Sequence, residues 1–203
     1  MIKRTSKSHI DKILSEKKNW KILDIGCGFN PNKYATTICD VLNLKEHYSD
    51  KKFVKLNNDN LPFADKEFDF VIASHVIEHV KDVDIFLKEL QRVSSKGYIE
   101  LPSILEDNLV FENKNDHLWH MEFDDDDKKL IISKKIQFLD PILTVSSAKK
   151  FSKYFRQSLV LELLWENSIE FNIVEKNFNE NEKISRISLI RKYFSKLLRN
   201  LIR

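Results

Sequence analysis

Residues 21–31 read KILDIGCGFNP, and this stretch decides the fold. Its apolar half, with Ile22, Leu23 and Ile25, is typical of a short buried strand. The strand runs into Gly26-Cys27-Gly28, which holds two of the three glycines of the chain. A glycine in so glycine-poor a sequence indicates a positive φ, or a ligand that approaches the main chain closely. The stretch predicts a tight turn at the carboxyl end of a strand, where open α/β sheets bind nucleotides. Taken alone, the pattern leaves a simple turn after a core strand as the alternative.

Length and composition indicate a soluble globular protein. The chain has 203 residues, 42% of them apolar and 32% charged, which suits one domain with an appendage. No apolar run reaches the length of about 18 residues that suggests a membrane-spanning helix, and the first residues show no evident secretory signal. Two cysteines, Cys27 and Cys39, do not make a disulfide framework. We therefore expect a cytoplasmic protein.

Charge is distributed unevenly along the chain. The net charge is +3, and the last 21 residues, 183–203, carry seven Lys or Arg and no acid. The body of the protein is therefore mildly acidic, and we expect no nucleic acid as its partner. Apolar residues recur along the tail at helical spacing with basic residues between them. This pattern predicts a basic amphipathic helix that packs on the domain or a partner, or that lies on an anionic membrane surface.

Strands alternate with helices or crossover segments over the first half of the chain. We predict strands at 22–25, 35–39, 53–56, 68–73 and 98–101, and helices at 8–18 and 82–93. Ser8 and Asp11 have the spacing of a capping box for the first helix. Gly97 stands where a glycine would cap the end of the second. The pattern predicts an α/β fold, a Rossmann-like doubly wound, mostly parallel sheet with helices on both faces.

The pattern changes after residue 103. Two β-type segments, 117–123 and 130–137, flank an acid-rich run and predict a β-hairpin insertion within residues 103–141. A helix follows at 146–155, and strands at 159–165 and 169–174 are close enough to pair as an antiparallel hairpin. We expect a domain over 1–180 and the basic helix over 181–203.

Polar residues follow three successive predicted strands. Asp24 and Asp40 end two of them, and Asn57, Asn58 and Asp59 follow the third. Backbone N–H groups of the glycine turn, a carboxylate for ribose hydroxyls and an amide or acid for an adenine amino group suit a nucleoside-containing cofactor. The dinucleotide pattern G-x-G-x-x-G is broken by Asn30-Pro31, and Asp24 suits a cationic amino acid end better than a phosphate. These points favour S-adenosylmethionine over NAD.

With these residues in place, the chain resembles the class I S-adenosylmethionine-dependent methyltransferases, and among them the small type 11 methyltransferase domains. The resemblance covers roughly residues 20–103, through the segments 22–31, Asp40, 57–80, 86–93 and 97–103. It implies cofactor contacts at Asp24, Gly26, Cys27, Gly28, Asp40, Asn57, Asn58, Asp59, Ser74 and His75. Two departures stand out: Asn30 replaces the third glycine, and the acid expected beside adenine aligns with Asn57 rather than Asp59.

The resemblance also points to the acceptor. Family members with a GCGxNP loop have a shortened first crossover and often carry a hairpin with His-x-Trp, which here is His117-Leu118-Trp119. Such members recur among enzymes of surface-glycan and lipid-linked sugar pathways. The resemblance thus implies methyl transfer to a small-molecule or glycan-like acceptor, and we expect the hairpin insertion to cover the acceptor site. A glycan context would suit a peripheral location at the inner face of the membrane, through residues 183–203.

Methyl transfer to an oxygen can require a general base. His75 and His117 are the candidates, with His120 as a third, because a neutral imidazole accepts a proton near pH 7. Residues 75–79 also show the H-x-x-E-H spacing of a zinc protease, but His75 falls at a predicted strand end. We assign no metal ligand; a zinc hydrolase and a bound ion at this turn stay as alternatives.

Two other functions compete with methyl transfer. One is an NAD-linked oxidoreductase, which the missing third glycine disfavours. The other is a non-catalytic binding module that keeps the fold. The sequence does not give the acceptor, the atom methylated or the oligomeric state.

Overall fold

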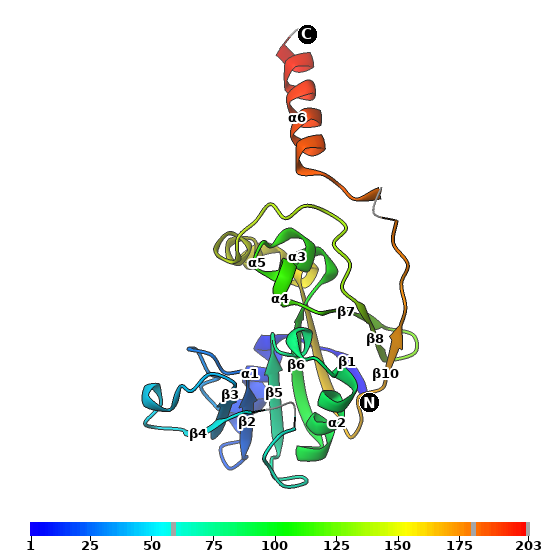
Figure 1. Ribbon diagram of the computed structural model, residues 1–203. Helices are drawn as coiled ribbons and strands as arrows, with labels where there is room; N and C mark the ends of the chain where they lie inside the picture. The colour runs from blue at the N-terminus through cyan, green and yellow to red at the C-terminus, as the bar shows by residue number, and fades with distance from the viewer. Residues whose placement is uncertain (58–59, 180–181, 202–203) are drawn as a thin grey trace.

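The main sheet has the doubly wound arrangement predicted from the sequence. A computed structural model describes residues 1–57, 60–179 and 182–201, and within them seven strands form one sheet in the order β1-β9-β6-β5-β2-β3-β4 (Figure 1). Neighbours among β2 to β6 run parallel, and β9 runs antiparallel to both β6 and β1. The bounds are β1 Ile2–Arg4, β2 Ile22–Ile25, β3 Thr37–Asp40, β4 Lys52–Lys55, β5 Phe70–Ser74, β6 Lys96–Pro102 and β9 Val160–Glu166.

Helices cover both faces of this sheet, as predicted. Helix α1 (Lys7–Glu16) packs Ile10 and Leu14 into one apolar cluster, and α2 (Val83–Val93) packs its apolar side chains into another. Strand β5 contributes alternate residues to the two clusters, Phe70 and Ile72 to the first and Val71 and Ala73 to the second. This alternation follows from the two-residue period of a strand, and it explains why β5 reads as a continuous apolar run.

The order of the strands reverses at β2. The chain passes from β2 outward to β3 and β4, and then returns to the other side of β2 as β5 and β6. The first crossover contains no regular helix, so the predicted shortening to a turn is confirmed. A crevice opens at the carboxyl ends of strands where such a reversal occurs, here between β2 and β5.

Three helices gather over the carboxyl end of β6, and we call them the cap: α3 (Ile104–Leu109), α4 (Asn113–Asp116) and α5 (Val145–Leu159) (Figure 1). The predicted hairpin is present as β7 (Trp119–Asp124) and β8 (Lys129–Lys134), joined by an exposed acidic turn. Two short 3₁₀ turns, η1 (Lys45–His47) and η2 (Ile77–His79), complete the connections.

The predicted antiparallel hairpin of 159–165 with 169–174 is wrong. Both strands form, but β9 lies between β6 and β1, so both of its edges are occupied. Strand β10 (Phe171–Val174) therefore pairs in parallel with β8, in a smaller sheet of order β10-β8-β7. The sequence analysis did not predict β1, whose Ile2 is fully buried.

Gly97 does not cap a helix. Helix α2 ends at Val93 with Ser94 as its cap, and Gly97 lies within β6. A Cβ at Gly97 would lie 2.6 Å from Nε1 of Trp165, so this glycine admits the indole ring from β9. Other boundaries shift by one to four residues, and Ser6 rather than Ser8 caps α1 by accepting the His9 N–H.

The basic tail forms the predicted helix, α6 (Arg186–Leu201), which stands away from the body (Figure 1). Its start is tied to the 135–143 segment through Ile184, whose carbonyl accepts the Asp140 N–H, and through the Lys183–Asp140 ion pair. The predicted boundary between the domain and the tail falls at 180 and 181, outside the described residues.

Candidate functional site

The glycine turn has the backbone predicted for it. Gly26 and Gly28 have φ values of 65° and 48°, in the left-handed region that favours glycine. The N–H groups of Gly26 and Cys27 donate to the carbonyl of Cys39, at 2.8 and 3.2 Å. The expectation that these two N–H groups face a ligand is therefore wrong, because the end of β3 already uses them. The turn instead presents the bare Cα of glycine to the crevice.

Asp40 fixes the same turn from β3. It is buried, and its Oδ2 accepts the N–H of Gly28 at 2.9 Å while its Oδ1 accepts the N–H of Leu42 at 2.8 Å. Each carboxylate oxygen has a second lone pair. Asp40 can therefore hold the loop and still accept hydroxyl groups from a ligand.

Asp24, on the neighbouring strand β2, is buried and accepts one hydrogen bond. Its Oδ2 accepts the N–H of Asn32 at 2.7 Å. Burial raises the pKa of Asp24 to about 6, against the opposing effect of that hydrogen bond. A cationic ligand group would relieve the cost of ionising this carboxyl.

Two clefts flank the glycine turn and share Gly26. A cleft of about 390 Å³ contains Asp24, Gly26, Cys27, Asn30, Ser74 and Glu100 among its lining residues. A cleft of about 330 Å³ is lined by Ile25, Gly26, Asp40, Val41, Leu56, His75, Val76, His79, Val80 and Phe86. The structure thus gathers most of the predicted cofactor residues around one turn. Gly28 joins them through its bond to Asp40, Asn57 is exposed beside Leu56, and Asn58 and Asp59 lie outside the described residues.

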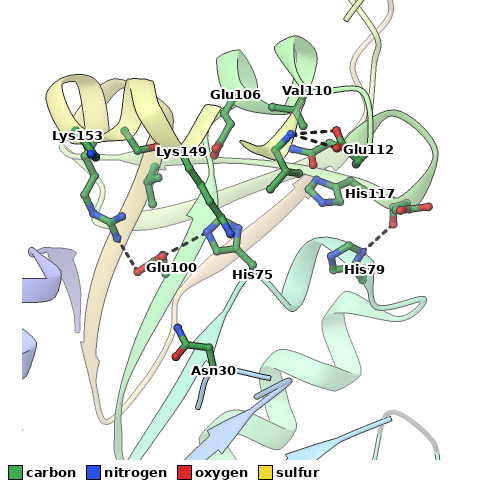
Figure 2. Close-up of a pocket in the computed structure, with 16 residues that line it drawn as sticks. Asn30, His75, His79, Glu100, Glu106, Val110, Glu112, His117, Lys149 and Lys153 are labelled. Atoms are coloured by element: carbon green, nitrogen blue, oxygen red, sulfur yellow. Dashed lines mark hydrogen bonds and ion pairs between the residues drawn. The ribbon is translucent and has the colours of Figure 1, made fainter. Parts of the chain in front are cut away.

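His75 lies at the end of β5 with a φ of 55°, rare for a residue other than glycine. Its Nδ1 lies 3.3 Å from Glu78. Its Nε2 lies 3.3 Å from Glu100 (Figure 2). Burial disfavours the imidazolium, but the two carboxylates outweigh it and raise the pKa of His75 to about 10. A ring that is charged at neutral pH does not suit the predicted role of general base.

A larger pocket of about 720 Å³ opens beneath the cap, and we call it the cap pocket (Figure 2). It shares Asn30 and Glu100 with the cleft that contains Asp24, and His75 and His79 with the cleft that contains Asp40. Its other lining residues are mostly polar and of both charges: Glu106, Val110, Glu112, Asn113, Asp116, His117, Val145, Lys149, Ser152, Lys153, Arg156 and Val160. A ligand in the clefts and a second molecule in the cap pocket would therefore meet near His75.

His117 lines the cap pocket, and a buried acid holds its ring. Its Nδ1 lies 2.6 Å from Oδ1 of buried Asp107. His120 and Lys135 lie 3.1 Å from the same carboxylate. Burial opposes ionisation of Asp107, but the two histidines outweigh it and hold the pKa of that carboxyl well below its usual range. Two of the three predicted histidines, His75 and His117, therefore line the cap pocket, whereas His120 is buried and is not a lining residue.

A second buried network, which the sequence analysis missed, fixes the cap. The hydroxyl of Tyr98 donates to Glu100 at 2.6 Å and to Glu162 at 2.8 Å. Arg156 from α5 pairs with both carboxylates, at 2.8 and 3.0 Å. Burial alone would raise the pKa of Glu100, but His75 and Tyr98 outweigh it and lower that pKa to about 2. Glu100 of β6 and Glu162 of β9 face each other across two strands that are distant in sequence, so no local pattern marked them.

Trp119 joins the hairpin to the η2 turn. Its Nε1 donates to the carbonyl of Val80 at 2.8 Å, and the ring is buried. Trp119 is not among the residues that line the cap pocket in the described chain. The His-x-Trp segment therefore places His117 at the pocket, and Trp119 anchors it.

Comparison with known proteins agrees with this geometry. Residues 23–99 match a family model described as a methyltransferase domain. The match confirms, for that part of the chain, the predicted resemblance to the S-adenosylmethionine-dependent methyltransferases of type 11. It supports the enzyme class and the cofactor that this resemblance implies.

Full-length similarity is more distant. An uncharacterized protein of Methanocaldococcus jannaschii is 29% identical over 187 residues, which cover 76% of this chain and 83% of that protein. A solved protein of Pyrococcus horikoshii is 15% identical, covers 80% of this chain and 92% of its own, and gives a TM-score of 0.44. A SAM-dependent methyltransferase from Aquifex aeolicus is 13% identical over 78% of this chain and 87% of its own, with a TM-score of 0.43. A Bacillus subtilis protein gives a TM-score of 0.39 at 16% identity, and the match covers 48% of this chain and 52% of that protein. These scores are too low to carry an argument, so the fold class rests on strand order and register.

Proposed function

We propose that this chain, which carries a methyltransferase domain over residues 23–99, transfers a methyl group from S-adenosylmethionine to a hydroxyl of a small-molecule or glycan-like acceptor. The observation that carries the proposal is the junction at His75. His75 lines both the cleft that contains Asp40 and a separate pocket of about 720 Å³, and its partner Glu100 lines that pocket and the cleft that contains Asp24.

The residues of the two clefts fit the cofactor. The cleft with buried Asp24 offers a carboxylate to the cationic amino acid end. The other offers Asp40 to the ribose hydroxyls and apolar Val41 and Leu56 to the adenine. Bound there, S-adenosylmethionine supplies a methyl group on a sulfonium leaving group. The chain's own contribution is to orient that group toward the cap pocket and to exclude water.

The lining of the cap pocket favours a polar acceptor. Carboxylates of Glu106 and Glu112 accept hydrogen bonds, and the ammonium groups of Lys149 and Lys153 donate them, which suits an acceptor rich in hydroxyls. The two lysines also suit an acceptor that carries an acidic group. We propose that His117, whose ring is held by Asp107, contacts the hydroxyl that accepts the methyl group.

A transfer assay tests the proposal. We would incubate the full chain with S-adenosylmethionine labelled at the methyl group and a panel of free sugars, nucleotide sugars and lipid-linked sugars. The expected result is label in an acceptor, lost in Asp24→Ala and reduced at least tenfold in His117→Ala. His9→Ala, at an exposed site on α1, is the matched control and should behave as the wild type. Cofactor binding without transfer to any acceptor would instead favour the non-catalytic module.

We also propose that α6 lies on an anionic membrane surface. Its described side chains are exposed, including Ile187, Ile190, Phe194, Leu197 and Leu198. Basic residues occupy the opposite side of the helix, as in interfacial amphipathic helices. The helices in the described chain are too short or too polar to cross a bilayer.

Co-sedimentation with vesicles tests this contact. The full chain should sediment with vesicles that contain anionic lipid, and a chain without residues 183–203 should not. Equal sedimentation of the two forms would reject the role of the tail.

A further inference from the structure

At one edge of the cap pocket, buried Glu78 lies close to two lining residues, His79 and His117, and our account of methyl transfer does not use the three together. Glu78 and His79 come from the η2 turn, and His117 comes from the segment before β7. One potential ligand atom of each lies within 4.8 Å of the others. The rings of His79 and His117 meet edge to face with centroids 4.5 Å apart, side by side in Figure 2.

Both histidines are held in the same tautomer. Nδ1 of His79 lies 2.9 Å from the carbonyl oxygen of Asp116, and Nδ1 of His117 lies 2.6 Å from the carboxylate of Asp107. A carbonyl or an ionised carboxylate only accepts hydrogen bonds, so each Nδ1 carries the proton. Nε2 is therefore the nitrogen of each ring that can offer a lone pair to a ligand. Metal-binding histidines typically have this arrangement, with the other ring nitrogen held by a carboxylate or a backbone carbonyl.

Glu78 is a buried acid that lacks adequate partners. Its side chain is only 1% exposed. Oε1 lies 3.3 Å from His75, while Oε2 has neither a hydrogen bond nor an ion pair with any residue that the structure describes. A buried carboxylate oxygen without a partner is costly, even where the other oxygen is paired. The orphaned oxygen thus points to a ligand that the protein alone does not supply.

We propose that Glu78, His79 and His117 bind one divalent transition-metal cation at the edge of the cap pocket. Ligand atoms about 2.1 Å from a shared ion lie about 3 to 3.5 Å apart. The three ligand atoms, which lie within 4.8 Å of one another, would close to that range when the cation binds. Two imidazoles and one carboxylate select manganese, iron or zinc over magnesium and calcium, which prefer an all-oxygen set.

The cation would have open positions that face the cap pocket. Two neighbouring hydroxyls of the acceptor could occupy them, and coordination would then lower the pKa of the reacting hydroxyl and orient it. His117 would in that case act on this hydroxyl as a ligand of the cation, because Nε2 cannot bind a metal and accept a proton at once. This part rests on the proposed function. Metal binding itself does not, because the three ligands belong to the folded chain.

Calorimetric titration of the full chain, first freed of metal with a chelator, tests the proposal. The probes are MnCl₂ and ZnCl₂, with MgCl₂ for comparison. We expect one manganese or zinc ion per chain and at least tenfold weaker magnesium. His79→Ala should weaken manganese and zinc binding at least tenfold, and so should Glu78→Gln, which keeps the shape of the buried side chain. His9→Ala should leave binding unchanged.

Absence of stoichiometric manganese or zinc binding by the wild type would overturn the proposal, and so would full affinity in both His79→Ala and Glu78→Gln. Titration of each variant with S-adenosylhomocysteine shows whether the fold and the cofactor site are intact. The same titration also distinguishes the proposed metal site from the proposed function. Metal binding without cofactor binding would contradict the proposed function alone, and the reverse would contradict the metal site alone.

Discussion

The glycine turn and the cap differ in how the chain builds them. The turn and its partners, Asp24, Gly26 and Asp40, come from a continuous stretch of about twenty residues and are fixed by bonds between adjacent strands. In the cap, Asp107 bonds His117 and Lys135, and Arg156 of α5 bonds Glu100 of β6. The turn is therefore a local structure that a short pattern can encode, whereas the cap exists only once distant segments have met.

The largest effect should come from the centre of the cap. Asp107→Asn keeps the shape of the side chain but leaves Lys135 and two histidines without a buried counter-charge. We expect the free energy of unfolding to fall by about 3–5 kcal/mol, measured by urea denaturation. Asp125→Asn removes an exposed ion pair with Arg4 at the hairpin tip and should cost less than about 1 kcal/mol. Equal losses in the two variants would show that the cap does not depend on Asp107.

The next largest effect separates the two glycines of the turn. A Cβ at Gly26 would lie 2.4 Å from Val76, whereas a Cβ at Gly28 meets no described atom within 4 Å. Gly26→Ala should cost about 2–4 kcal/mol of stability, from positive φ and overpacking together, and Gly28→Ala about 1–2 kcal/mol, from φ alone. Urea denaturation measures both. The same loss in both variants would mean that Val76 moves aside freely.

The charged form of Asp24 should lower the free energy of unfolding and strengthen cofactor binding. The native protein keeps the proton of Asp24 up to a pKa of about 6, whereas the ordinary pKa of an aspartate is 3.8. Stability from this group should therefore fall as the pH rises from about 4 to 6, and Asp24→Asn should gain about 1–3 kcal/mol at pH 8. Denaturation at pH 5 and pH 8 measures this difference. The same variant should bind S-adenosylmethionine at least tenfold more weakly at pH 8. A variant that is less stable at pH 8 would show that the buried carboxylate is not strained.

The smallest effect concerns the wall of the cap pocket. Lys149→Ala should raise the KM for an acidic acceptor about three- to tenfold and leave cofactor affinity unchanged, because Lys149 lines the cap pocket but neither cleft. Steady-state kinetics with an active acceptor measure this change. An unchanged KM would place the acceptor elsewhere in the pocket.

The sequence predicted the local structure around the glycine turn and missed the long-range contacts of the cap. The strand, the two glycines and the helices on both faces were predicted because apolar periodicity and glycine scarcity are local signals. Asp107 and Glu100 carry no local signal, since an acid that ends up buried is identical in sequence to an exposed one. The pairing of β10 with β8 could not be predicted either, because it depends on β1 occupying the edge of β9. That contact joins opposite ends of the chain.

His75 shows, for a single residue, what the sequence could predict and what it could not. Its position at the strand end was predicted, but its charge was not, because that charge comes from Glu78 and Glu100 on either side. The sequence analysis assigned no metal ligand at H-x-x-E-H and left a bound ion there as an alternative, because it considered only the spacing within one segment. The ligand set that we propose takes its third member, His117, from beyond β6.

The central claim is that the two clefts around the glycine turn hold S-adenosylmethionine, and calorimetric titration tests it most directly. The account predicts that the purified full chain binds S-adenosylmethionine and S-adenosylhomocysteine with a Kd in the micromolar range, about −8 kcal/mol, and does not bind NAD. Binding of NAD, or of none of the three, would contradict it.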